Sequence, residues 1–263
     1  MNRFKLWVLA AIITTMSLLT ACSQTGGESQ NGSEGTSSEG TIDTAAPALA
    51  DYNTDIIENN LWQRTELAAR DRSLITVAAM VTKNQSGELP DEIARAMDNG
   101  LEPASISETI THLAFYSSWP NGLAAARVAG PVFEQRGVEA ADLPGGDVTL
   151  LEQDQVAEAQ RAAGVQRDYG QTAPGVVEFT TDTLFGDLWL RPDLTPRDRS
   201  VVTVASLVAA GQTAQIPFHL GRALDNGLTP AQASETLTHL AFYAGWPNVF
   251  SAMPIFRDVL AAR

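Results

Sequence analysis

A long apolar run in the second half of the chain predicts a buried helix. Nearly every side chain from 201 to 208 is apolar, a pattern that alone would also fit a buried strand. Thr195 and Pro196 precede the run as N-cap and first helical residue, and Asp198 completes a turn that resembles a capping box. These start signals, the length of the segment and its alanines favour a helix.

The other apolar segments are bounded by similar helix starts and stops. A helix is predicted from about Pro217 to Asn226 and ends at Gly227, and the next begins at Thr229 and stops at Gly245. Further helices are expected over about 152–169, 176–188 and 249–262. No segment of note alternates apolar and polar residues with the period of a strand, so we expect an all-α fold.

The body of the chain is one helical unit present twice. Residues 61–133 align with residues 188–260 at a constant shift of 127 without a gap, and about half of the positions are identical. We therefore expect two similar units packed together. The expected boundaries are a signal segment at 1–22, a tether at 23–50, a first unit at 51–136, a connector with a helix at 137–175 and a second unit at 176–263.

Composition limits the classes of function. The chain has 263 residues, 44% of them hydrophobic, which is ample for a packed core. With 31 acidic and 17 basic side chains, the formal net charge of −14 argues against binding to nucleic acid. The single cysteine excludes an intramolecular disulfide, a CxxC redox pair and zinc or iron–sulfur sites built on several thiolates.

The first 22 residues predict a secreted lipoprotein. A basic start precedes an apolar run at 6–19, which is short for a membrane-spanning helix. The ending Leu-Thr-Ala-Cys at 19–22 resembles a bacterial lipobox, in which Cys22 is lipidated and becomes the new N-terminus. The alternative is an ordinary signal peptide that contains a cysteine. Residues 23–50, rich in Gly, Ser, Thr and Glu, would then tether an extracytoplasmic protein of the cell envelope to a membrane.

Two equivalent helix faces carry a carboxylate, an imidazole and a phenol. Glu235, His239 and Tyr243 are spaced by four residues and share one face. Their counterparts in the first copy are Glu108, His112 and Tyr116. A carboxylate one turn from an imidazole suits general acid–base catalysis, whereas the alternative is a structural histidine that the glutamate satisfies. One histidine and one glutamate are too few ligands to predict a metal site.

Further candidates lie at helix starts and ends. His219 has Glu92 as its first-copy counterpart, so it is either a drifted surface residue or the specialised site of the functional copy, and we favour the second. The arginines of the run 197–199 could bind a carboxylate, although such a run at a helix start equally fits a capping and salt-bridge element, which we favour. Trp246 ends a helix and is expected to pack a corner or to line a pocket.

Four segments of the second copy match a known family. They are Asp-Arg-Ser-x-x-Thr-Val-Ala at 198–205, the stretch 212–220 that ends in Pro-Phe-His-Leu, Arg-Ala-Leu-Asp-Asn-Gly-Leu-Thr at 222–229, and the stretch 235–248 that includes His-Leu-Ala-Phe-Tyr-Ala-Gly-Trp-Pro. Together they closely resemble the carboxymuconolactone decarboxylase family of alkyl hydroperoxidase D-like helical proteins. The resemblance covers nearly all of residues 51–263.

The resemblance implies an all-α bundle that usually assembles from several identical units, so the fused pair looks like a pseudo-dimer and a homo-oligomer is expected. It implies that CO2 is removed from 4-carboxymuconolactone without a cofactor, at a site between units, with a small carboxylate or lactone as ligand. His219 matches a family histidine, and His239, oriented by Glu235, is the second expected proton-transfer group. The expected substrate-binding residues are Tyr243, Trp246 and Arg199.

The chain also departs from its family. Alkyl hydroperoxidase D relatives carry CxxC before the histidine that corresponds to His219, and residues 212–217 contain no cysteine, which excludes thiol peroxidase chemistry. The first copy lacks this histidine and is expected to be degraded or supporting. Two hypotheses follow: a cofactor-free carboxy-lyase or proton-transfer enzyme acting on a small carboxylated lactone or enol acid, which we favour, and a non-catalytic surface lipoprotein that uses the fold for ligand binding or assembly.

Overall fold

The computed structural model describes residues 38–263, with side chains from residue 42 onward. The expected signal segment with Cys22, and residues 23–37 of the expected tether, lie outside the described residues. Internal contacts divide the chain after residue 50, and residues 51–263 form one compact unit. In the part of the chain that is described, no helix is both long and apolar enough to cross a membrane.

The end of the expected tether is helical. Helix α1 spans Ser38–Ala45 and helix α2 spans Pro47–Tyr52. Alanine and leucine favour helix, and Pro47 occupies the first position of α2, where its missing N–H costs nothing. These residues therefore differ from the flexible segment that their polar composition predicted.

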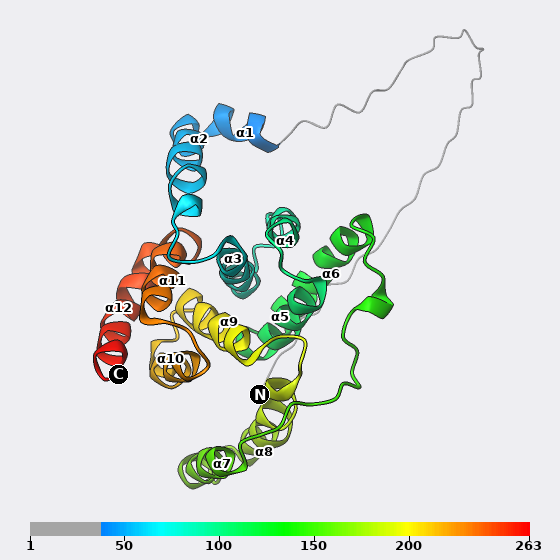
Figure 1. Cartoon of the computed structure of the whole chain (residues 1–263), viewed down its shortest axis with the longest axis vertical. Coiled ribbons are helices and arrows are strands. Elements are labelled where there is room, and N and C mark those ends of the chain that lie inside the picture. Colours follow the sequence, from blue (N-terminus) through cyan, green and yellow to red (C-terminus); the bar gives the residue numbers. More distant parts are fainter. Residues whose placement is uncertain (1–37) are drawn as a thin grey trace, which may run out of the picture. The chain divides into compact units, whose positions relative to one another are not determined.

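The two copies have the same order of helices, which confirms the all-α prediction of two similar units (Figure 1). After α2, the first copy contains η1 (Asn53–Glu58), η2 (Leu61–Gln63), α3 (Ala69–Lys83), α4 (Leu89–Asp98), α5 (Pro103–Tyr116) and α6 (Trp119–Gln135). The connector contains η3 (Ala140–Asp142) and α7 (Gln155–Tyr169). The second copy contains α8 (Pro174–Phe179), η4 (Thr180–Phe185), η5 (Leu188–Leu190), α9 (Pro196–Ala209), η6 (Thr213–Gln215), α10 (Ile216–Asp225), α11 (Pro230–Tyr243) and α12 (Trp246–Ala261).

Local signals explain most of these boundaries. The Thr195 hydroxyl accepts from the Asp198 N–H at the start of α9, and Gly227 follows α10 with a φ of 98°. The last helix begins at Trp246, three residues earlier than expected, because Pro247 stands in its first turn and does not break it.

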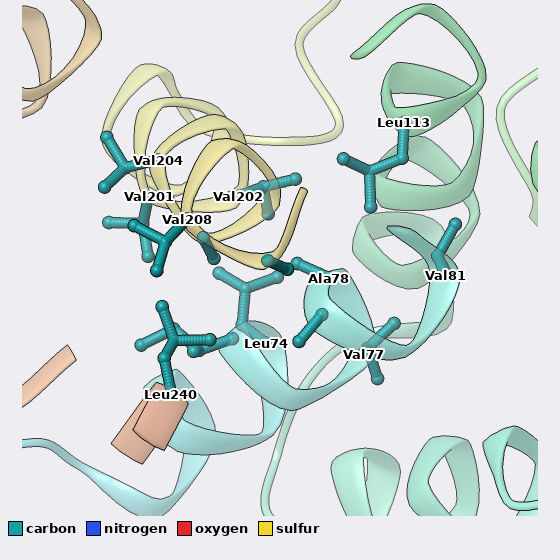
Figure 2. Packing of buried hydrophobic residues seen from close by; sticks show 14 of the residues in the cluster. Leu74, Val77, Ala78, Val81, Leu113, Val201, Val202, Val204, Val208 and Leu240 are labelled. Carbon is teal, nitrogen blue, oxygen red and sulfur yellow. The ribbon is translucent and has the colours of Figure 1, made fainter. Parts of the chain in front are cut away.

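Helices α3 and α9 form the centre of the 51–263 unit, and each is contacted by both α5 and α11 (Figure 1). Leu74, Ala78 and other apolar residues of α3 face the valines of α9, with Leu113 of α5 and Leu240 of α11 beside them (Figure 2). Residues 71–79 and 198–209 are buried without interruption, so the central turns of these two helices have no solvent face. The boundary between the copies therefore runs through the core.

The repeated Arg-Asp-Arg runs join the two central helices. Arg70 donates to Asp198 at 2.7 Å, and Arg197 donates to Asp71 at 2.6 Å, so each copy contributes one arginine and one aspartate to a crossed ion-pair network. This geometry agrees with the salt-bridge role expected for these runs.

Candidate active site

Two polar sites lie between the copies, and each takes residues from both. The α10 site consists of Trp189, Arg191, Arg199, Thr203, His219 and Arg222 of the second copy with Glu108, His112 and Tyr116 of α5. The α4 site consists of Trp62, Arg64, Arg72, Thr76, Glu92 and Arg95 of the first copy with Glu235, His239 and Tyr243 of α11. Both sites lie between the units, and the sequence prediction named only some of their residues: Glu108, His112, Tyr116, Arg199 and His219 in the α10 site, and Glu235, His239 and Tyr243 in the α4 site.

Each buried glutamate lies between two arginines of the other copy. Glu235 accepts from Arg64 Nε at 2.7 Å and from Arg72 Nη2 at 2.8 Å. Burial alone would raise the pKa of Glu235, but the hydrogen bonds from the two arginines hold that pKa below its ordinary value. The α10 site repeats this arrangement with Glu108 between Arg191 and Arg199. Glu235 therefore does not orient His239, which corrects the expectation, because the arginines of the other copy take its oxygens.

The paired histidines contact threonines. His112 Nε2 lies 2.7 Å from Thr203 Oγ1, and Arg199 Nη1 lies 3.3 Å from His112 Nδ1. A guanidinium can only donate, so Nδ1 accepts and Nε2 carries the proton. His239 makes the same 2.7 Å contact with Thr76.

Both histidines are fully buried. Burial lowers the pKa of His239 to about 3 and that of His112 well below its ordinary value, with nearby arginines as the next cause. They are therefore neutral and inaccessible to a substrate. This matches the alternative of a structural histidine, except that the histidine contacts a threonine and not the expected glutamate.

A tryptophan and a tyrosine extend each site. Trp189 Nε1 donates to the Tyr116 hydroxyl at 2.8 Å, and Trp62 Nε1 donates to the Tyr243 hydroxyl at 3.0 Å. Burial raises the pKa of Tyr243 to about 12 and raises that of Tyr116 further. Both phenols therefore stay protonated and hold a tryptophan in place across the boundary between the copies.

His219 belongs to the α10 site and is separate from His239. Its ring lies 5.3 Å from Tyr116 and 5.9 Å from Trp189, measured between ring centres. Burial, and then the charge of Arg222, lower the pKa of His219 to about 4. The structure therefore does not bring His219 and His239 together. It joins His219 instead to the first-copy residue Tyr116.

A pocket of about 670 Å³ lies between α10 and the connector segment 151–161, and the 7% exposed His219 stands behind its wall, not among the residues that line it. Trp189 and Phe218, which both contact the His219 ring, line it together with Phe185 and Arg222. Three arginines line the pocket, and two of them, Arg161 and Arg263, pair with acidic side chains that also line it. The aromatic side chains and the remaining arginine, Arg222, suit a small, partly apolar anion.

The remaining expected site residues lie away from this pocket. Arg199 is fully buried, and its guanidinium is taken by Glu108 and the Arg191 carbonyl, so it positions other groups and cannot meet a substrate. Tyr243 belongs to the α4 site. Trp246 is 56% exposed beside Phe242 and is not among the residues that line the pocket.

The sequence prediction missed Phe185, Trp189 and Arg222. The signal was available in the internal alignment, where Phe185 and His219 replace Glu58 and Glu92 while the arginine is kept. The second copy has lost two acidic residues around an arginine that both copies retain, and this difference would have identified Arg222 as a candidate binding residue.

Comparison with known proteins agrees with the repeated fold. The family model described as carboxymuconolactone decarboxylase family matches twice, at residues 47–130 and 174–258. The chain belongs to the carboxymuconolactone decarboxylase family. Both polar sites are assembled from residues within the matched ranges, whereas the connector that faces the pocket lies between them.

Two curated relatives are decarboxylases. The chain is 35% identical over 81 residues to 4-carboxymuconolactone decarboxylase of Acinetobacter baylyi, covering 31% of this chain and 60% of the relative. It is 32% identical over 89 residues to nitrosuccinic acid decarboxylase of Metarhizium robertsii, covering 34% of this chain and 62% of the relative. The chain therefore spans about three fifths of the length of these relatives. At the level of the family, these relatives support a decarboxylase-like function.

Proposed function

We propose that the α10 site is the active site of a cofactor-free carboxy-lyase or proton-transfer enzyme that acts on a small carboxylated lactone or enol acid. The observation that carries this proposal is that the neutral imidazole of His219 packs against Trp189 and Phe218, two side chains that line a pocket together with Arg222. The names of the two curated relatives support a small carboxylated substrate.

The chemistry needs a proton donor and a partner for negative charge. The bond between the substrate carbon and its carboxylate breaks, CO2 leaves, and the electron pair passes into a conjugated acceptor group to form an enolate-like anion. Arg222 stabilises this anion, and the neutral His219 relays a proton from water to carbon: one ring nitrogen accepts a proton from water as the N–H of the other gives its proton to carbon, which leaves hydroxide to combine with the CO2 as bicarbonate.

The test is CO2 release by the full chain, purified in detergent, from 4-carboxymuconolactone and from nitrosuccinate. His219→Gln is expected to lower kcat/KM by about 100-fold or more. Glu92→Gln, the matched first-copy substitution, should leave kcat/KM near the native value. An unchanged rate in His219→Gln, or no CO2 release by the native chain from either acid, would contradict the proposal.

We also propose that Cys22 anchors the protein to the cell envelope, on the basis of its lipobox-like sequence. Metabolic labelling with a radioactive fatty acid should label the native chain and not Cys22→Ser. Labelling of both chains would remove the basis for an anchor at this residue.

A further inference from the structure

The two copies hold one arginine in the same place. The Arg95 guanidinium lies 4.8 Å from the ring centre of Trp62, and the Arg222 guanidinium lies 4.2 Å from the ring centre of Trp189. Each arginine stands on the first α-helix after its central helix, three residues after the position of Glu92 or His219. Both guanidinium groups thus lie over equivalent tryptophans.

In the α4 site, Arg95 pairs with two carboxylates of its own copy. Glu58 accepts from Arg95 Nη1 at 3.1 Å and from Nη2 at 2.9 Å, a two-point contact. Glu92 Oε2 lies 3.7 Å from Arg95 Nε, and burial raises the pKa of Glu92. The Arg95 charge is therefore satisfied from within the protein.

The α10 site has lost both carboxylates. Phe185 stands at the position of Glu58, with its ring 5.6 Å from the Arg222 guanidinium, and His219 stands at the position of Glu92. Within residues 42–263, no carboxylate or carbonyl oxygen forms a hydrogen bond or ion pair with Arg222. Arg222 is partly buried, and burial lowers its pKa although the charges of Tyr116 and Glu158 oppose this shift.

The other charges around the pocket are nearly all engaged elsewhere. Glu158 pairs with Arg161, and Asp225 pairs with Arg263. The Asp154 carboxylate accepts two backbone N–H groups at the start of α7. Of the acidic side chains that line the pocket, only Glu152 is left, and it is exposed on the connector. Arg222 is thus the cation of the pocket that has no partner among these groups.

We propose that Arg222 binds the anionic group of the ligand in the α10 pocket, in the two-point geometry with which Glu58 binds Arg95. The ligand carboxylate would therefore contact Arg222 as the Glu58 carboxylate contacts Arg95. The chain then has one anion site and not two, although the arginine is present twice. The inference rests on the proposed function for the location of the reaction, but it concerns binding, which is measurable without turnover.

The first test is calorimetric titration of the full chain with benzoate, and with benzamide as the neutral analogue. Benzoate matches the aromatic walls and supplies one carboxylate. We expect one benzoate per native chain, no saturable binding of benzamide, and a loss of affinity of about tenfold or more in Arg222→Gln. Arg95→Gln, the matched control, should bind benzoate like the native chain.

The second test moves the internal carboxylate between the copies. Phe185→Glu should supply Arg222 with an internal carboxylate and abolish benzoate binding. The double substitution Glu58→Phe with Glu92→His should free Arg95 of its carboxylates and raise the stoichiometry from one benzoate per chain to two. Because Phe185 is buried, its variant is scored only after circular dichroism shows a native helix content. The double variant changes Glu58 and Glu92 of the α4 site, and a gain of binding is a result that misfolding cannot produce.

Several results would overturn the inference. They are no saturable benzoate binding by the native chain, undiminished binding in Arg222→Gln, and a stoichiometry that stays at one in the double variant. The two proposals fail separately. Benzoate binding without CO2 release would remove the reaction and leave the anion site, whereas CO2 release by a native chain that binds no benzoate would remove the anion site and leave the reaction.

Discussion

The α4 and α10 sites share a buried frame and differ at the rim. In both frames a glutamate lies between two arginines, a histidine contacts a threonine, and a tryptophan donates to a tyrosine. The rim of the α4 site is Glu58, Glu92 and Arg95, and the rim of the α10 site is Phe185, His219 and Arg222.

The frame and the rim differ in which copies supply them. Each frame joins residues of both copies, so a change on one side leaves a buried charge on the other side unpaired. Each rim lies within a single copy and can change without disturbing that contact. The duplicated chain has therefore kept two frames, while its rims have diverged into one that is satisfied internally and one that is open to a ligand.

Removal of a frame arginine should give the largest effect on stability. Arg72→Met and Arg199→Met each leave a buried glutamate with one partner in place of two, and each should lower the free energy of unfolding by about 3 kcal/mol or more. Urea unfolding followed by circular dichroism measures this loss.

Equal losses in the two copies would show that both frames are structural. Arg167→Met, which removes an exposed ion pair, is the control and should remain close to the native protein. A loss confined to Arg199→Met would mean that the frames are not equivalent and would break the comparison.

The two rims should respond to acid in opposite directions. Burial lowers the pKa of His219 in the folded protein to about 4, whereas the ordinary pKa of histidine, which applies to the unfolded chain, is about 6.5. Between these two values the unfolded chain binds more protons than the folded protein, so the free energy of unfolding falls as the pH falls. The contribution of His219 to this loss is about 2 kcal/mol between pH 7 and pH 5. Burial raises the pKa of Glu92, so this residue contributes stability at low pH that is lost as the pH rises through its folded pKa.

Urea unfolding at pH 7 and pH 5 tests these signs. His219→Gln should be less sensitive to acid than the native chain, and Glu92→Gln should be more sensitive. Changes of the same sign in both variants would contradict the pKa shifts assigned to the two rims.

Local sequence signals were sufficient for the fold. Caps, prolines and a terminal glycine mark helix ends within one turn of the chain, and the repeat shows that two copies of one helical order are present. The starts of α7 and α12 are shifted by three residues. The largest difference is at the helix predicted over 176–188, where α8 ends at Phe179, η4 continues to Phe185 and Leu188 begins the separate turn η5.

The frame could not be predicted in the same way. Helical spacing correctly places Glu235 and His239 on one face of α11, but it says nothing about the element opposite that face. The partner Arg64 is 171 residues away in the sequence, and only the packing of the copies brings it to the glutamate. Spacing therefore suggested a glutamate–histidine pair where the structure has two arginines and a threonine.

Loss of a phenol should have a moderate effect that differs between the copies. Tyr116→Phe leaves the N–H of Trp189 without its partner in a side chain that is 3% exposed, whereas Tyr243→Phe leaves the N–H of the half-buried Trp62, which water can reach more easily. We expect a loss of about 1–2 kcal/mol for Tyr116→Phe and a smaller one for Tyr243→Phe. Thermal unfolding followed by circular dichroism ranks the two, and the reverse order would show that exposure does not distinguish them.

Helix capping should give the smallest effect and provides a test by exchange. Thr229 caps α11 by accepting from the Gln232 N–H, and Gln232 accepts from the Thr229 N–H in return, whereas Glu102 caps α5 without a side-chain hydrogen bond. Thr229→Ala should destabilise the protein by about 1 kcal/mol, and Glu102→Thr should stabilise it by a few tenths of a kcal/mol or more, because it supplies the missing acceptor. Chemical unfolding at pH 7 measures both changes. Because neither residue belongs to a frame or a rim, benzoate binding should remain native in both variants, and a change in binding would show that the ends of these helices influence the sites between the copies.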